Sequence, residues 1–166
     1  MRSLQDYLKE NKTSILSLGC GHSNKPETFG VDIQELPGVD LVADLNNGIP
    51  LPSNSFDVIK AHDFLEHIDM KNRIKIMEEI YRVLKPGGIF NFIVPSTDGN
   101  NRGAFADPTH VSFWNEVSFW YYLDDVYGKG FRSLYNIRCW FIPRHLETYY
   151  NEWNVTYVRG NLEKQK

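Results

Sequence analysis

The sequence predicts an α/β fold built on a doubly wound, mostly parallel β-sheet, and two features of its pattern carry this prediction. Short apolar runs recur through the first half of the chain, and several are continuous rather than alternating, as expected of strands covered on both faces. A helical pattern separates the last two runs, so that strand, helix and strand follow one another as in a parallel crossover unit. The apolar runs are residues 15–18, 29–33, 39–43, 56–61 and 89–94.

The connection between the second and third runs is unusually short. Only residues 34–38 join them, whereas a parallel crossover usually needs a dozen or more residues. The third strand is therefore expected to be very short and to be reached by an extended return of the chain.

The clearest helix lies between the fourth and fifth runs, because apolar residues recur there at helical spacing. Asp69 is expected to cap its start, and Pro86-Gly87-Gly88 to end it and turn the chain into the next strand. The spaced apolar residues are Ile74, Met77, Ile80, Tyr81 and Leu84.

The last third of the chain is predicted to add one helix and two strands. The helix is expected over about residues 115–127, and the β-rich stretches lie near residues 133–142 and 153–159. These two stretches could pair with each other through the loop between them. Together with the five earlier runs they give a seven-stranded sheet with an antiparallel edge strand.

Length and composition limit the classes of protein that the chain can belong to. With 166 residues, it is expected to form a single domain over residues 1–166. The net charge of −3 and the lack of a basic stripe argue against a nucleic-acid partner. Two cysteines fit a reducing compartment, and no signal core or membrane-length apolar window is found. We therefore expect a cytoplasmic protein with no membrane partner.

The aromatic residues are concentrated in the second half of the chain. Of the 23 aromatic residues, 16 lie after residue 100, including Phe119-Trp120-Tyr121-Tyr122. One interpretation is that they pack the flank of the sheet and one face of a helix. Another is that some of them line a pocket or a homo-oligomer interface, where aromatic side chains are enriched. The two interpretations are compatible.

A glycine turn follows the first apolar run. Gly19 and Gly21 can adopt positive φ and allow a ligand to approach without a side chain in the way. A dinucleotide-binding turn would read G-x-G-x-x-G, with an acidic residue about 20 positions further on. Here Asp32 follows Gly21 by 11 positions, and Ser23 and Asn24 stand where the third glycine would fall. The turn can open at most one helical turn, so it is a poor site for NAD.

With these pieces in place, the chain resembles a class I S-adenosylmethionine-dependent methyltransferase of the small "type 11" kind. Five blocks in family order carry the resemblance, which covers roughly residues 14–94 well and the rest loosely. It implies a Rossmann-like fold, here in a minimal version with a shortened first helix. The blocks are Leu16-Ser17-Leu18-Gly19-Cys20-Gly21, Gly30-Val31-Asp32, Ala43-Asp44-Leu45, Phe56-Asp57 with Leu65-Glu66-His67, and Arg82-Val83-Leu84-Lys85-Pro86-Gly87-Gly88.

The resemblance also implies the cofactor, S-adenosylmethionine, with S-adenosylhomocysteine as the product. Asp32 would accept hydrogen bonds from both ribose hydroxyls, since a carboxylate offers two acceptor oxygens. Asp44 would accept from the adenine amino group, and Leu45 would offer its backbone amide to the ring. For each acid the alternative is a turn residue or helix cap. The residues implied at the cofactor are Gly19, Cys20, Gly21, Asp32, Ile33, Asp44, Leu45, Ala61 and His62.

A long polar loop after the fifth run is the candidate acceptor site. Its Asp-Pro-x-His pattern, from Asp107 to His110, is similar to that of methyltransferases acting on sugars, glycan precursors or other small polar molecules. Since the ordinary pKa of histidine lies near neutrality, His110 could take a proton from an acceptor hydroxyl, with Asp107 beside it. Alternatively, Asp107 and His110 only close the loop by hydrogen bonds.

Two further alternatives stay open at the level of sequence. The stretch Asp63-Phe64-Leu65-Glu66-His67 is similar to the acid-x-x-Glu-His stretch of ubiquinone-pathway O-methyltransferases, where the acids and the histidine can hold Mg²⁺ or Mn²⁺. Glu66 could equally brace a loop or helix start, and the prediction is that no metal binds. The second alternative is a non-catalytic binder of S-adenosylmethionine or S-adenosylhomocysteine, or a partner subunit that has lost the chemistry.

Overall fold

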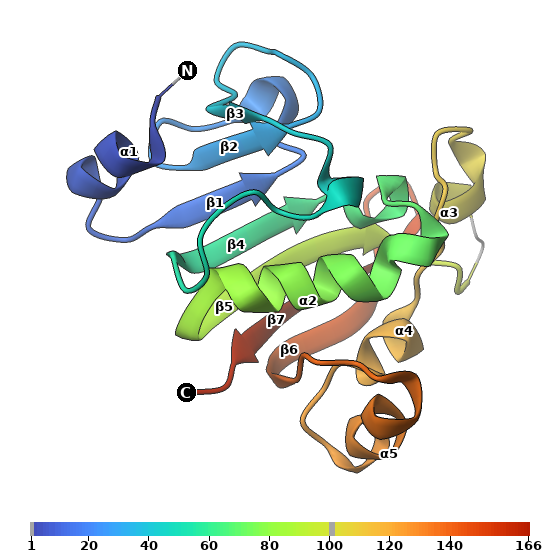
Figure 1. Cartoon of the computed structure of the whole chain (residues 1–166). Helices are drawn as coiled ribbons and strands as arrows, with labels where there is room; N and C mark the ends of the chain where they lie inside the picture. The colour runs from blue at the N-terminus through green and yellow to red at the C-terminus, as the bar shows by residue number, and fades with distance from the viewer. Residues whose placement is uncertain (1, 100–101) are drawn as a thin grey trace.

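The computed structural model describes residues 2–99 and 102–166, and Figure 1 shows the arrangement of the elements. Their strands form one seven-stranded sheet in the order β3-β2-β1-β4-β5-β7-β6. The strands are β1 (Ile15–Leu18), β2 (Phe29–Asp32), β3 (Leu41–Val42), β4 (Phe56–His62), β5 (Leu84–Pro95), β6 (Phe141–Tyr150) and β7 (Thr156–Lys164). The first five strands are parallel, whereas β7 runs antiparallel to both β5 and β6. The predicted fold class, a mostly parallel seven-stranded sheet with an antiparallel edge, is confirmed.

Five α-helices and four single-turn 3₁₀ helices accompany the sheet in the described residues. The α-helices are α1 (Leu4–Glu10), α2 (Arg73–Val83), α3 (Arg102–Ala106), α4 (Glu116–Trp120) and α5 (Val126–Tyr135). The 3₁₀ helices are η1 (Gly21–Ser23), η2 (Leu45–Asn47), η3 (Leu65–His67) and η4 (Met70–Asn72). None of the helices in the described ranges has the length and apolar character needed to cross a bilayer.

The early connections largely follow the sequence-based prediction. Between β1 and β2 the only helical element is the single turn η1, so the first helix is indeed shortened. The strand β3 has two residues and pairs with β2 in parallel through Val31–Leu41 and Asp32–Val42. The connection over residues 33–40 brings the chain back by a turn, closed by a hydrogen bond from the amide of Val39 to the carbonyl of Leu36 at 3.1 Å, rather than by an extended return.

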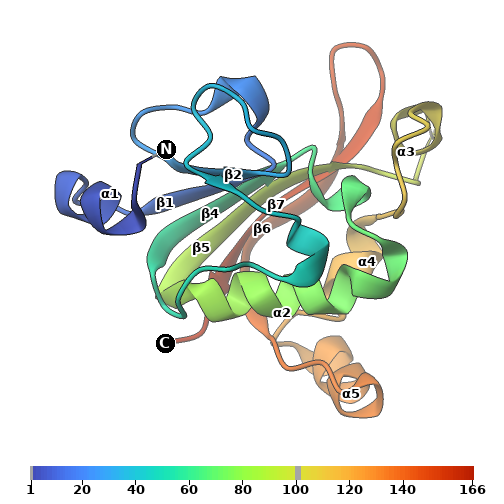
Figure 2. The same cartoon turned by 45° about the horizontal axis from the view of Figure 1, so that its top comes forward.

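One face of the sheet is packed against helices, and the other is only partly covered. Figure 2 shows α2 and α4 against one side of the sheet, with α1 at the far end of β1 and β2. Along β4 and β5 fully buried residues such as Ile59 and Phe90 alternate with the half-buried Lys60 and Asn91. The expectation of strands covered on both faces is therefore met only in part, and the less covered face carries both polar and apolar residues.

The helix α2 begins later and ends earlier than predicted. It starts at Arg73 with Asn72 as its N-cap residue, because the turn η4 intervenes after Asp69, whose side chain makes no capping bond. It ends at Val83, since Leu84 is already extended, and residues that precede a proline disfavour the helical conformation. Pro86 and the two glycines that follow it thus lie within β5 rather than in a turn.

The predicted helix over residues 115–127 is two helices. Asn115 caps α4 in a capping box with Ser118, and Asp125 caps α5 by accepting a hydrogen bond from the amide of Gly128 at 2.7 Å. The second cap interrupts the helix that the apolar pattern alone predicted. The predicted strand over residues 133–142 is likewise wrong at its start, because α5 continues to Tyr135 and β6 begins at Phe141. The last strand begins at Thr156, three residues later than predicted, and extends to Lys164.

Aromatic residues from the second half of the chain fill much of the core. Phe119 stacks on Phe92 and on Trp114, with ring centroids 4.1 and 5.1 Å apart. All three side chains are almost completely buried. Packing against the flank of the sheet therefore accounts for this part of the aromatic cluster. The expectation of a homo-oligomer interface stays a prediction.

Candidate cofactor and acceptor sites

The glycine turn after β1 is tightly built around left-handed backbone conformations. Gly19 has φ of 59° and Gly21 has φ of 53°, a region that costs other residues about 1–2 kcal/mol. A Cβ atom on Gly19 would lie 2.7 Å from the ring of Phe64. The turn thus requires a glycine at this position for both backbone and packing reasons.

Asp32 closes this turn from the end of β2. Its Oδ2 accepts a hydrogen bond from the amide of Gly21 at 2.9 Å, and its Oδ1 accepts from the amide of Gln34 at 3.0 Å. A carboxylate has about four acceptor positions, so each oxygen keeps one position for a further donor. The half-buried Asp32 is therefore oriented by the backbone without being saturated.

A cavity of about 200 Å³ lies beside Asp32, between the carboxyl ends of the strands and the turns η2 and η3. It contains five of the predicted cofactor residues, namely Gly19, Asp32, Ile33, Asp44 and Leu45. The sequence-based prediction missed the remaining lining residues, which are Ala43, Asn46, Asp63, Phe64, His67 and Ile68. Asp63 and Phe64 directly follow β4, so the rule that ligands bind at strand ends could have identified them.

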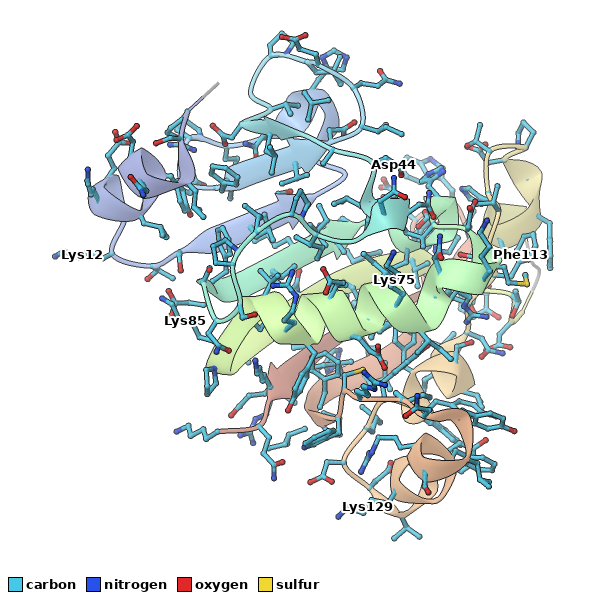
Figure 3. All side chains as sticks on the ribbon, viewed as in Figure 1. Lys12, Asp44, Lys75, Lys85, Phe113 and Lys129 are labelled. Atoms are coloured by element: carbon cyan, nitrogen blue, oxygen red, sulfur yellow. The ribbon has the colours of Figure 1, made fainter. Side chains whose placement is uncertain are left out.

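Asp44 projects from the turn that follows β3, as Figure 3 shows. Its carboxylate caps η2, accepting hydrogen bonds from the amide of Asn46 at 3.0 Å and from the side-chain amide of Asn47 at 3.2 Å. The structural alternative for this acid, a helix cap, is therefore realised. The side chain of Asp44 is exposed to solvent at the rim of the cavity. Ile33, which is 64% exposed, offers an apolar surface at the same rim.

The predicted residues Cys20, Ala61 and His62 do not line the same cavity as Asp32 and Asp44. Cys20 and His62 line a neighbouring hollow, which includes Lys60 from the less covered face of the sheet. Ala61 is completely buried. The side chain of His62 is engaged with Asn91, with Nε2 and Oδ1 2.5 Å apart. Burial raises the pKa of the Cys20 thiol to about 11, so this cysteine is not a reactive thiolate at neutral pH.

The long loop after β5 brings His110 and Asp107 next to the cofactor cavity. Both residues line a third hollow, which also includes Asp63 and His67. Asp63 and His67 line the cavity beside Asp32 as well, so the two spaces adjoin the same two side chains. Tyr157 from β7 also lines this hollow.

The imidazole of His110 is almost buried and is held by the backbone. Its Nδ1 lies 3.0 Å from the carbonyl oxygen of Ala104, which can only accept, so Nδ1 carries the hydrogen. The lone pair of Nε2 therefore faces the hollow, 4.0 Å from Glu66 Oε1 and 3.9 Å from Asp107 Oδ2. The Asp107 carboxylate also closes its own loop, because it accepts hydrogen bonds from the hydroxyl and amide of Thr109 at 2.6 and 2.8 Å. These bonds hold the pKa of Asp107 below its usual range.

Glu66 is the most unusual group of the site. Glu66 is only 2% exposed, and within the described residues neither of its carboxylate oxygens has a hydrogen-bond partner. Burial raises the pKa of Glu66 to about 8, because an apolar environment disfavours the charged form. Its main-chain carbonyl accepts hydrogen bonds from the amides of Val111 and Ser112 at 2.9 and 3.0 Å, which fixes the loop against η3.

Known proteins share this architecture. The model of a family described as "Methyltransferase domain" matches residues 23–92. A demethylmenaquinone methyltransferase of Listeria welshimeri is 28% identical over 108 residues, which are 64% of this chain but only 40% of that protein. This chain therefore matches less than half the length of that relative.

Solved structures agree on the fold. A didemethyltoxoflavin N-methyltransferase of Burkholderia thailandensis, solved with bound S-adenosylhomocysteine, superposes with a TM-score of 0.63 at 15% identity, covering 95% of this chain and 73% of its own. A SAM-dependent methyltransferase from Archaeoglobus fulgidus gives 0.63 at 16% identity, covering 97% and 91%. At these identities the likeness concerns the fold.

The mostly parallel sheet, the glycine turn and the cavity at the strand ends have the layout of α/β proteins that bind ligands at a topological switch point. The family match and the relatives narrow this class further. Residues 23–92 match the methyltransferase-domain family, and the described residues have the fold of S-adenosylmethionine-dependent methyltransferases of known structure.

Proposed function

We propose that the chain is an S-adenosylmethionine-dependent methyltransferase that methylates a hydroxyl oxygen of a small polar or sugar-like acceptor. The observation that carries the proposal is that two neighbouring hollows share lining residues. One is lined by Asp32 and Asp44, and the other by His110, with Asp63 and His67 shared between them. A donor in the first hollow and an acceptor in the second would thus meet.

The adenosyl group of the cofactor is assigned to the cavity beside Asp32. The two free acceptor positions of that carboxylate suit the two ribose hydroxyls, and Ile33 offers an apolar surface to the adenine ring. Asp44 and the amide of Leu45 are proposed to bind the ring edge. The methionine part would lie toward the Gly19 turn, where Cys20, Ala61 and His62 are the proposed neighbours.

The chemistry requires alignment and removal of one proton. The acceptor oxygen attacks the methyl carbon in line with the sulfonium, the carbon–sulfur bond breaks, and its electron pair stays on sulfur to give S-adenosylhomocysteine. The hydroxyl proton is proposed to go to Nε2 of His110, whose lone pair is free because Nδ1 donates to a backbone carbonyl. Asp107, 3.9 Å from that nitrogen, would stabilise the resulting imidazolium.

The test has two stages. Calorimetry on the full chain should detect binding of S-adenosylhomocysteine, and mass spectrometry should then detect methyl transfer to members of a panel of sugars and polyols. Binding without turnover across that panel and a broader set of small acceptors would favour the non-catalytic binder or partner subunit. Absence of binding would refute the proposed function itself.

A further inference from the structure

We infer that Glu66, His67 and His110 form a binding site for one divalent transition-metal cation, with Zn²⁺ as the type ion. The ligands would be a carboxylate oxygen of Glu66 and one ring nitrogen of each histidine. In the structure these three atoms lie within 4.8 Å of one another, although they come from segments more than 40 residues apart. The inference departs from the sequence-based prediction that the protein holds no metal.

The two histidines are held as metal-binding histidines usually are. Nδ1 of His110 faces the carbonyl oxygen of Ala104 at 3.0 Å, and Nδ1 of His67 faces that of Thr109 at 3.3 Å. A carbonyl oxygen only accepts, so each Nδ1 carries its hydrogen and each Nε2 presents a lone pair. This tautomer, fixed by a hydrogen bond to the backbone, is the one that outer-shell contacts impose on histidine ligands.

The buried carboxylate of Glu66 supplies an independent argument. Neither of its oxygens has a hydrogen-bond partner among the described residues, and Glu66 is only 2% exposed; the nearest cationic group, His110 Nε2, lies 4.0 Å from Oε1. Burying such a group without compensation is costly, and native proteins normally pair it or let it coordinate a metal. A divalent cation beside Glu66 would provide that compensation.

The local structure keeps the site assembled. The carbonyl of Glu66 accepts hydrogen bonds from the amides of Val111 and Ser112 at 2.9 and 3.0 Å, next to His110 in the chain. The hydroxyl of Ser112 in turn donates to the carbonyl of Leu65 at 2.8 Å within the buried interior. These bonds join η3 to the loop before α4, so the backbone around the buried Glu66 and the nearly buried His110 is fixed, while the exposed His67 lies on the solvent side of the site.

The donor set selects the class of cation. Two imidazoles and one carboxylate suit Zn²⁺ and other first-row transition metals, whereas Mg²⁺ prefers oxygen ligands. Zinc bonds to such ligands are about 2.0–2.2 Å long, so two ligands are at most about 4.4 Å apart and the side chains must close in by a few tenths of an ångström. Three protein ligands leave a coordination position open, as in catalytic zinc sites.

The open position would face the proposed acceptor hollow, and this consequence rests on the proposed function. With the cation on Nε2 of His110, an acceptor hydroxyl bound to the metal would have a lowered pKa and could release its proton to water or to Asp107. Without the cation, His110 would take that proton itself. The inferred cation thus alters the route of the proton, while the bond that forms and the bond that breaks in the methyl transfer stay the same.

The test is a zinc titration of the full, tag-free chain after treatment with a chelator. Calorimetry and elemental analysis should give one Zn²⁺ per wild-type chain, with much weaker binding of Mg²⁺. Glu66→Gln, His67→Ala and His110→Ala should each weaken Zn²⁺ binding by more than the roughly 10- to 100-fold that loss of an outer-shell partner costs. His145→Ala is the matched control, because His145 is half-exposed on β6, lies beside Glu147 at 3.2 Å and is outside the site.

Thermal unfolding guards against variants that simply fold poorly. Zn²⁺ should raise the melting temperature of the wild type and of His145→Ala, and should leave that of Glu66→Gln unchanged. Failure of the wild type to bind Zn²⁺, or an equal loss in His145→Ala, overturns the inference. Binding of S-adenosylhomocysteine is measured in parallel. If S-adenosylhomocysteine binds while Zn²⁺ does not, the metal site is refuted and the proposed function stands. If Zn²⁺ binds while S-adenosylhomocysteine does not, the proposed function is refuted and the metal site stands.

Discussion

Replacing Asp32 by alanine is the sharpest perturbation of the proposed cofactor cavity. The carboxylate accepts hydrogen bonds from the amides of Gly21 and Gln34 at 2.9 and 3.0 Å, and these bonds orient it. One acceptor position on each oxygen is then left for a ribose hydroxyl. Asp32→Ala removes both of these positions and also loosens the turn.

The expected loss can be estimated from the hydrogen bonds involved. A hydrogen bond to a charged group contributes about 1.5–3 kcal/mol net. Two ribose hydroxyls would lose such a bond, but water that enters the space left by the side chain can accept from them and offset part of the loss. We therefore expect a loss of about 1.5–3 kcal/mol, which corresponds to roughly 10- to 150-fold weaker binding. Asp32→Asn, which keeps one acceptor oxygen, should fall between the wild type and Asp32→Ala.

The assay is calorimetric titration of S-adenosylhomocysteine into the full chain, with melting temperatures recorded for each variant. Asp40→Ala serves as the matched control, because Asp40 also accepts a backbone hydrogen bond, from Gly30 at 2.9 Å, but does not line the cavity. Unchanged affinity in Asp32→Ala would refute the ribose role. An equal loss in Asp40→Ala would show that the effect is one of general stability.

Four further outcomes are expected. His110→Ala should retain S-adenosylhomocysteine binding while methyl transfer falls by about 10²- to 10⁴-fold, as expected when a general base is lost. Gly19→Ala should lower the melting temperature and weaken cofactor binding, since φ of 59° is strained for alanine and its Cβ would lie 2.7 Å from a phenylalanine ring. Hydrogen bonds from Arg82 hold the pKa of Glu79 below its ordinary value of 4.5, so Glu79→Gln should cost roughly 1–2 kcal/mol at pH 7. That difference should disappear as the pH falls through the lowered pKa of the folded state, which urea unfolding at several pH values can measure. Cys20 and the other cysteine are buried, so a thiol reagent at pH 8 should label neither in the folded protein and both in urea.

Contrary results are equally specific. Full turnover in His110→Ala would move the base elsewhere. Gly21→Ala, whose Cβ would meet nothing within 4 Å, should be milder than Gly19→Ala, and the opposite order would contradict the packing argument. A cost for Glu79→Gln that grows toward low pH would reverse the predicted sign. Rapid labelling of Cys20 in the native state would contradict its burial.

The sequence predicted the parallel half of the sheet well because the physical cause is local. The mainly apolar runs over residues 15–18 and 56–61 each became a strand with little change of bounds. The very short β3 was also expected, since only five residues are available for the return. The boundaries of α2 were less accurate, because the turn η4 intervenes before Arg73 and the chain is already extended at Leu84, two residues before Pro86.

The last third of the chain was predicted less well for a similar reason. Tyr127, Phe131 and Tyr135 are spaced four apart, and their rings pack along α5 with centroids 4.7 and 6.0 Å apart. Aromatic residues also favour strands, so their helical spacing was overlooked and the segment was divided between a helix and a strand. The cap at Asp125 was the signal that could have corrected this.

The site was predictable only where it is local in sequence. Asp32 and the glycine turn were recognisable from spacing, because strand ends place them together. The neighbourhood of Glu66 and His110 was not, since it depends on main-chain hydrogen bonds between η3 and a loop more than 40 residues away. A carboxylate without partners becomes visible only after the chain has folded around it.

The most direct test of the proposed cofactor site is a crystal structure of the chain with S-adenosylhomocysteine. The proposal predicts both ribose hydroxyls within about 2.5–3.0 Å of the Asp32 carboxylate, with the adenine ring between Ile33 and Leu45. A ligand bound elsewhere, with Asp32 and Asp44 facing different surroundings, would contradict it.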